Sequence, residues 1–246
     1  MKPLLGSSVH IFKQISRHFN SSKVLLASPK SAKKKLPRHL PPNAINHKQK
    51  YDYFFILDFE ATCDEPEKPE PQEIIEHACL RFNRKKLEVD SAFHSYIRPV
   101  AHPQLTPFCV QLTGIIQEDI DKAPTFDEVW SDFQLWLRSC KFSKDSSIFV
   151  TSGSWDLQYM LPHQLNYSQL QPVDDLKQWI DLKKAFCKHY GRFPFGIKDM
   201  LKTLKLPHLG KLHNGYDDCT NIVNIVKHMI EDDKILDQTD QLTEPE

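Results

Sequence analysis

The chain has 246 residues, of which 40% are hydrophobic, so it can bury a full core in one domain with extensions. The formal net charge is zero, but residues 1–50 hold 11 Lys or Arg and no acid, which leaves 21 basic and 32 acidic residues from 51 onward. No apolar run is long enough to span a bilayer, and the six cysteines form no C-x-x-C pair. These features exclude a membrane-spanning helix and a zinc site of that kind, and we expect reduced thiols and no membrane partner.

The N-terminal residues combine an apolar helical face with a basic arc. Leu5, Val9 and Phe12 share that face, and no acid interrupts it. A basic, acid-free, amphipathic segment is typical of a mitochondrial transit peptide. We therefore expect residues 1–50 to be a mitochondrial transit peptide followed by an unstructured linker. The alternatives are a nuclear import signal at residues 33–35 or a disordered nucleic-acid-binding arm, and the alternative locations are nuclear or cytoplasmic.

The first predicted strand is the apolar run 53–57, and Asp58-Phe59-Glu60 follows it directly. Side chains at i and i+2 of a strand share one face, so Asp58 and Glu60 are expected about 7 Å apart. Two such carboxylates repel each other unless a cation lies between them, and paired divalent metals in nucleases use this arrangement. The alternative is that the strand ends here and both acids are solvated. The Pro- and Glu-rich segment 64–71 is interpreted as a solvated loop.

Alternating and helical patterns then predict a mixed α/β order. Strands are expected near residues 74–82 and 91–98, as antiparallel hairpins, and at 147–151. Residues 126–137 repeat apolar side chains at helical spacing, which indicates core packing. Asp156 follows the strand at 147–151 through a turn into a helical stretch, where α/β proteins place ligand-binding groups. A helix cap is the simpler alternative for Asp156.

The last predicted helix places one carboxylate toward the core. Ile222 marks its buried stripe, and Asp218 lies four residues earlier on the same stripe, whereas Asp217 is expected to face solvent. A buried carboxylate needs compensation, which a metal ion can supply. His213 precedes Asp218 by five residues on a Gly-containing loop, and an imidazole there can act as a general base.

Together these residues resemble the DEDDh superfamily of 3′-to-5′ exonucleases, which is named for four acids and a histidine. Beyond that set, the segments that resemble the Eri-type exoribonucleases are 58–63, 73–76, 112–115, 153–156 and 217–222. Segments 102–109 and 147–151 are most similar to the third member, the prion-protein-interactor branch. The resemblance covers about residues 51–231. The chain departs from that branch at His77-Ala78, where a Pro is typical, and at Lys211-Leu212, where Arg-Pro is typical.

The resemblance implies a ribonuclease H-like α/β fold, a mixed central sheet flanked by helices. It implies an exonuclease domain at 51–231, between the 1–50 extension and an acidic tail at 232–246. The implied ligands of two Mg²⁺ or Mn²⁺ ions are Asp58, Glu60, Asp156 and Asp218. The implied catalytic residues are His213, as the general base, and Glu60. The implied contacts to the terminal nucleotide are Glu60, Ala61, Leu112, Thr113 and His213.

The expected activity is a metal-dependent hydrolysis that releases 5′-mononucleotides from single-stranded RNA 3′ ends. Residues 177–211 hold nine basic residues and two acids, so we expect this segment to contact phosphates. The equally simple alternative is that these are solvated charges on helices. The alternatives are a DNA-directed exonuclease, an oligoribonuclease-like enzyme acting on short fragments, or a non-catalytic RNA-binding scaffold of the same fold. The sequence does not specify a protein partner.

Overall fold

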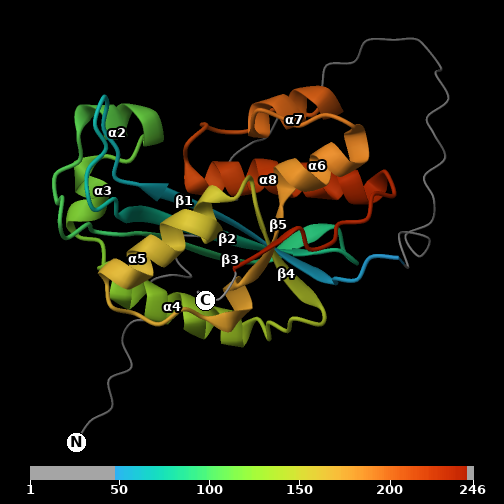
Figure 1. Cartoon of the computed structure of the whole chain (residues 1–246), viewed down its shortest axis with the longest axis horizontal. Coiled ribbons are helices and arrows are strands. Elements are labelled where there is room, and N and C mark those ends of the chain that lie inside the picture. The colour runs from blue at the N-terminus through green and yellow to red at the C-terminus, as the bar shows by residue number, and fades with distance from the viewer. Residues whose placement is uncertain (1–47, 243–246) are drawn as a thin grey trace, which may run out of the picture. The chain divides into compact units, whose positions relative to one another are not determined.

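A computed structural model of the chain describes residues 48–242 (Figure 1). The expected transit peptide and nearly all of the linker lie outside the described residues. A six-stranded sheet of order β3-β2-β1-β4-β5-β6 forms the centre of the domain. None of the helices between residues 48 and 242 is long and apolar enough to cross a membrane.

The strands are β1 (Tyr53–Ala61), β2 (Ile74–Asn83), β3 (Glu88–Tyr96), β4 (Ser147–Thr151), β5 (Gln178–Asp181) and β6 (Asp240–Gln241). The chain pairs β1, β2 and β3 as antiparallel neighbours, then places β4 parallel to β1 and β5 parallel to β4. β6 closes the other edge antiparallel to β5. The predicted mixed sheet with antiparallel hairpins near its start is therefore confirmed.

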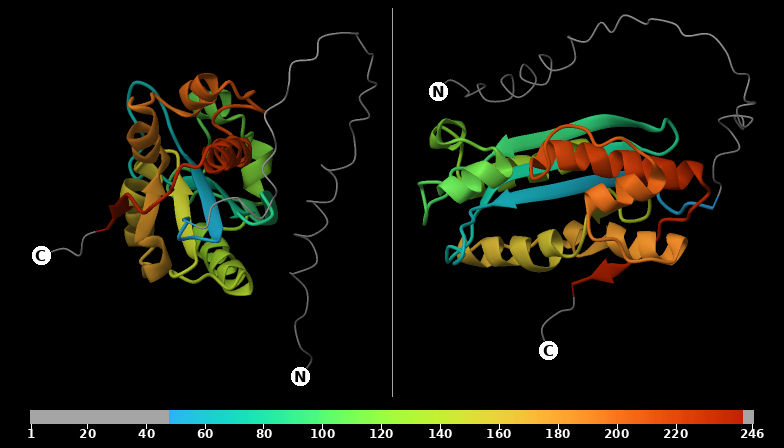
Figure 2. Two further views of the ribbon diagram at one scale, coloured as in Figure 1. Left: turned by 90° about the vertical axis from the view of Figure 1, so that its right-hand side faces the viewer. Right: turned by 90° about the horizontal axis from the view of Figure 1, so that it is seen from above.

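The helices are α2 (Pro107–Thr113), α3 (Gln117–Asp121), α4 (Phe126–Ser139), the π-helical turn η2 (Trp155–Met160), α5 (Leu161–Tyr167), the 3₁₀ turn η3 (Asp174–Leu176), α6 (Leu182–Tyr190), α7 (Ile197–Leu204) and α8 (Gly215–Glu231). Helices α6, α7 and α8 cover one face of the sheet, while α4 and α5 cover the other (Figure 2). Short helices α2 and α3 pack at one end, around Ile75 and Cys109.

Strand β1 divides the core by alternation. Phe54 and Ile56 pack in the α8 layer, whereas Phe55 and Leu57 pack in the α4 layer. Period-2 alternation of side chains across a strand explains the two layers. The same alternation sends Asp58 and Glu60 toward the α8 layer, which positions the site described below.

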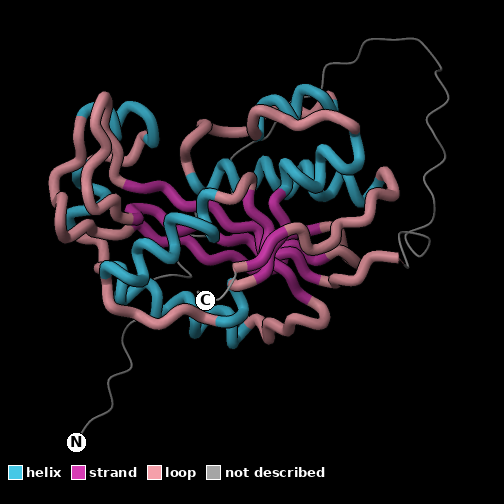
Figure 3. Tube along the Cα trace, in the orientation of Figure 1, coloured by secondary structure: helices cyan, strands magenta, loops and turns pink. Residues whose placement is uncertain are grey.

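From the end of α8 to residue 242, the chain belongs to the folded domain and does not form a separate tail (Figure 3). Leu236 is fully buried, and its N–H donates to Oε1 of Gln49 at 3.0 Å. Leu242 N–H donates to the carbonyl of Lys177 at 2.8 Å beside the β5–β6 pair. The domain thus extends beyond the expected boundary at residue 231.

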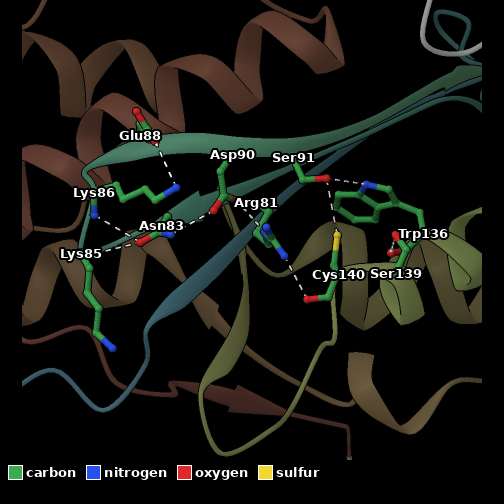
Figure 4. A network of polar contacts seen from close by, with 10 residues as sticks. All are labelled: Arg81, Asn83, Lys85, Lys86, Glu88, Asp90, Ser91, Trp136, Ser139 and Cys140. Carbon is green, nitrogen blue, oxygen red and sulfur yellow. Dashed lines mark hydrogen bonds and ion pairs between the residues drawn. The ribbon is translucent and has the colours of Figure 1, made fainter.

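A polar network fastens the β2–β3 hairpin to α4 (Figure 4). Arg81 Nε contacts Asp90 Oδ1 at 2.6 Å, and Arg81 Nη1 donates to the carbonyl of Cys140 at 3.0 Å. Trp136 Nε1 donates to Ser91 Oγ at 2.9 Å. These bonds are partly buried, and those of Arg81 are charge-assisted, so they hold β3 beside β2 and fix α4 against both strands.

Candidate active site

Strand β1 supplies the first two carboxylates. Asp58 and Glu60 lie within the strand and share its α8-facing side, and they are 9% and 8% exposed. The alternative in which the strand ends and both acids are solvated is therefore wrong. Two carboxylates on one buried strand face carry a large desolvation cost, which a bound cation offsets.

The third carboxylate comes from the turn after β4. Asp156 is 5% exposed, and its Oδ1 accepts a hydrogen bond from the N–H of Phe59 at 3.0 Å. It therefore bridges to β1 rather than only capping its own helix. Ser154 Oγ donates to Asp181 Oδ2 at 2.8 Å, which fixes the turn that carries Asp156. Residues about 100 apart in the sequence thus meet at the carboxyl ends of two parallel strands.

The fourth carboxylate and the histidine come from the start of α8. Asp218 is 4% exposed, and its Oδ2 accepts the N–H of His213 at 2.9 Å. Its Oδ1 is buried without a hydrogen-bond partner. Ligand atoms of Glu60, His213 and Asp218 lie within 4.8 Å of one another. A buried carboxylate oxygen without a partner, beside other oxygen donors, fits a hard divalent cation.

Burial and mutual repulsion raise the pKa of each acid in this group. The pKa of Asp58 is raised well above its ordinary value by burial and by Asp156, and that of Glu60 is raised to about 9 by burial and by Glu76. Burial also raises the pKa of Asp156 to about 7 and that of Asp218 to about 6. The protein alone therefore disfavours the ionised forms of these acids, which a bound cation would favour.

His213 has the opposite shift. Partial burial, Lys198 and Lys211 lower its pKa, which favours a neutral imidazole that can accept a proton. Its side chain is exposed, and its backbone has a positive φ of 60°. The left-handed conformation turns the loop so that the His213 N–H reaches Asp218.

The sequence analysis missed the role of a fifth buried acid. Glu76 of β2 is fully buried, and its Oε2 accepts the N–H of Gly215 at 3.0 Å. Its Oε1 lies 2.7 Å from Nε2 of His94. Glu76 therefore anchors the first turn of α8, which carries Asp218. An acid in the apolar run of β2, in phase with Ala78 and Leu80, was the available signal.

The carboxylates open into a cavity of about 860 Å³. Ala61 and Leu112, two of the residues that the resemblance assigns to the terminal nucleotide, line it. Thr113 is not among the lining residues. It is 1% exposed, and its hydroxyl donates to the carbonyl of Cys109 at 2.9 Å within α2. The solvated loop expected at 64–71 is largely exposed, but it also supplies part of the cavity wall.

One face of α8 differs from the prediction. Asp217 is half-buried, and its Oδ2 accepts the N–H of Lys211 at 2.8 Å. Asn221 is fully buried, and its side chain bonds both the N–H and the carbonyl of Leu209. The solvent-facing interpretation of Asp217 is therefore wrong, because the loop before His213 packs over that side of the helix.

Three comparisons agree with this geometry. The sequence matches the model of the exonuclease family over residues 55–226. It is 50% identical to ERI1 exoribonuclease 3 of Homo sapiens over 182 residues, and this alignment covers 73% of this chain and 54% of the relative. It is 37% identical over 186 residues to 3'-5' exoribonuclease 1 of Homo sapiens, which covers 74% and 53%. The nuclease domain of 3'hExo, a DEDDh family member, bound to rAMP, superposes with a TM-score of 0.75 at 35% identity, covering 78% of this chain and 98% of that chain.

The fold, the four acids and the histidine define an exonuclease domain of the DEDDh class. The chain belongs to the Eri-type branch of this family, and the expected resemblance to its third member is confirmed. The chain spans about half the length of the curated relatives it matches. The fold implies a divalent-metal site, and the buried carboxylates described above fit one.

Proposed function

We propose that this domain is a metal-dependent 3′-to-5′ exoribonuclease that releases 5′-mononucleotides from single-stranded RNA ends. The observation that carries the proposal is the cluster of four buried carboxylates facing one open cavity. The names of the relatives, which are exoribonucleases, support it, and so does the rAMP in the 3'hExo nuclease domain.

The proposed ligands of two Mg²⁺ or Mn²⁺ ions are Asp58, Glu60, Asp156 and Asp218. Oxygen-only donors suit these cations, and the oxygen of Asp218 without a partner is the strongest local support. Such ions, when bound, neutralise the scissile phosphate and increase the acidity of the attacking water. His213 holds a neutral imidazole nitrogen ready to accept the water proton. Glu60 serves both the metal site and the terminal nucleotide.

The terminal nucleotide is proposed to lie against Glu60, Ala61 and Leu112 in the cavity. Thr113 would act from behind this wall, because its hydroxyl accepts the N–H of Ile115 at 3.1 Å and so shapes the end of α2. Unstacked bases enter such a pocket more readily than bases held in a duplex. We therefore expect hydrolysis to stop at stable duplex.

The test uses end-labelled single-stranded RNA and DNA of matched sequence, with Mg²⁺ or with chelator. We expect mononucleotides bearing a 5′-phosphate from RNA, and no hydrolysis in chelator. Internal fragments from a substrate blocked at its 3′ end would exclude an exonuclease. Equal rates on RNA and DNA would overturn the RNA preference alone. RNA binding without hydrolysis would indicate the scaffold alternative.

We also propose that residues 1–50 direct the protein to mitochondria. Their acid-free, basic composition supports this proposal. A reporter fused to residues 1–50 should accumulate in mitochondria and lose the segment there. Nuclear accumulation of the uncleaved fusion would favour the import signal at residues 33–35.

A further inference from the structure

The cavity has two chemically different walls. Asp64, Glu65 and Lys68, from the loop after β1, lie on one wall, which carries a net negative charge. Lys183 of α6 and Lys198 of α7 lie on another. A polyanionic strand that leaves the metal site is repelled by the first wall and attracted by the second. The charge distribution therefore favours a path for the strand along α6 and α7.

An exposed aromatic ring stands on the basic wall. Phe195 lines the cavity and is 92% exposed. The turn that carries it is held in place, because Phe195 N–H donates to Asp199 Oδ2 at 3.0 Å. Asp199 in turn binds Arg192 through two contacts, Nη1 to Oδ1 at 3.2 Å and Nη2 to Oδ2 at 2.5 Å. This pair also neutralises the one acid of α7 that lines the cavity.

An exposed phenyl on a turn whose backbone is held in place, three residues before an exposed lysine, is a suitable site for one nucleotide unit. The ring offers a stacking face that accepts any base, and the Lys198 ammonium offers a charge for the adjoining phosphate. Phe193 is also exposed, at 59%, but it does not line the cavity. Only Phe195 of this pair therefore combines exposure with a place at the site.

We propose that Phe195 and Lys198 form a subsite for the RNA strand on the 5′ side of the terminal nucleotide, with a base stacked on Phe195 and a phosphate at Lys198. The inference rests on the proposed function and specifies how its substrate is held. Because the subsite lies upstream of the scissile bond, it distinguishes an oligonucleotide from the mononucleotide product. The subsite is therefore tested by binding and not by turnover, because Lys198 also lowers the pKa of His213.

The experiment compares Phe195→Ala with the matched control Phe193→Ala. Binding of a fluorescein-labelled oligouridylate to the full chain is measured by anisotropy in Ca²⁺, and AMP binding by competition. We expect Phe195→Ala to weaken oligouridylate binding about 5- to 150-fold, the range for loss of one stacked base, with unchanged AMP affinity. Phe193→Ala should match the wild type. Equal oligouridylate affinities in all three proteins, or equal losses in both variants, would overturn the subsite.

A second pair of variants tests the phosphate contact. The log of the affinity falls linearly with the log of the salt concentration. Lys198→Gln should make this slope shallower by about 0.7, the value for one phosphate of a single strand. Lys202→Gln should keep the wild-type slope, because Lys202 is exposed on the same helix but does not line the cavity. Equal slopes for Lys198→Gln and the wild type would overturn this part. Since these measurements need no hydrolysis, a protein that binds as expected but never cuts RNA would contradict the proposed function and not the subsite.

Discussion

Glu60 of β1 stands directly opposite Glu76 of β2 in the antiparallel register. Both carboxylates are buried, and the nearby charge of Glu76 contributes to the raised pKa of Glu60. Glu76 nevertheless has a clear structural task, since its Oε2 holds the Gly215 N–H at the start of α8. Glu76 therefore both repels Glu60 and positions Asp218 through the start of α8.

Glu76→Ala should lower the free energy of unfolding by about 1–3 kcal/mol, because the buried Gly215 N–H loses its acceptor. Turnover should also fall, since the α8 turn that carries Asp218 becomes less fixed. Urea denaturation and kcat on single-stranded RNA measure both effects. Glu76→Gln keeps an acceptor oxygen and should retain most of the stability. Wild-type stability and turnover in Glu76→Ala would show that the contact is dispensable.

Asp58→Asn should abolish both the stabilisation of the domain by Mg²⁺ and most of its RNA hydrolysis. Replacing this carboxyl group removes the cost of burying it and its repulsion with Asp156 and Glu60, so the metal-free variant should melt at a higher temperature than the metal-free wild type. Adding Mg²⁺ should raise the melting temperature of the wild type and not that of the variant. RNA hydrolysis should fall at least about 100-fold, which corresponds to loss of a few kcal/mol of transition-state stabilisation.

Asp217→Asn is the matched control for that experiment. The amide oxygen can still accept the N–H of Lys211, so the loop before His213 should keep its place. We expect near wild-type hydrolysis and a wild-type response to Mg²⁺ from Asp217→Asn. A loss in Asp217→Asn as large as that in Asp58→Asn would contradict the assignment of Asp218, rather than Asp217, to the metal site.

His213→Asn should lower kcat about 100-fold, the lower end of the range for a lost general base. Asn tolerates the positive φ of this position, and the backbone N–H can still donate to Asp218. The variant should therefore keep the wild-type melting temperature, as measured by circular dichroism. Undiminished kcat in the folded variant would remove His213 from the proton transfer.

The part of the site that follows local periodicity was predictable from the sequence. The period of a strand placed Asp58 and Glu60 on one face, and the phase of α8 relative to Ile222 identified Asp218 as buried. Both inferences need only a few neighbouring residues. The same holds for α4, whose predicted apolar stripe is buried.

Contacts between distant segments could not be predicted in this way. The pairing of Glu60 with Glu76 depends on the register of two strands, and the burial of Asn221 depends on a loop that folds back over α8. Helical phase alone assigned Asp217 to solvent because it cannot include that loop. Thr113 likewise contributes to the packing of α2, which a motif does not reveal.

His77 is a polar residue at a core position on the opposite face of the sheet from the carboxylates. It is fully buried, and its ring centroid lies 4.8 Å from that of Phe59, 5.1 Å from that of Phe93 and 4.2 Å from that of Phe133. Neither ring nitrogen has a hydrogen-bond partner. Burial, with a smaller effect of His94, lowers the pKa of His77 to about 3. An aromatic hydrocarbon would suit this position better than an imidazole.

His77→Phe should therefore stabilise the domain by about 1–3 kcal/mol at pH 7, where the buried nitrogens of the neutral ring are unsatisfied. The gain should grow in acid. The unfolded chain binds a proton at His77 below the ordinary pKa of 6.5, whereas the folded protein resists protonation until the pH reaches about 3. The free energy of unfolding of the wild type therefore decreases as the pH falls from 6.5 toward 3. Urea denaturation of both proteins from pH 8 to pH 4 measures the difference. RNA hydrolysis at pH 7 should not change, because His77 faces the α4 layer; parallel stability curves for the two proteins would contradict the prediction.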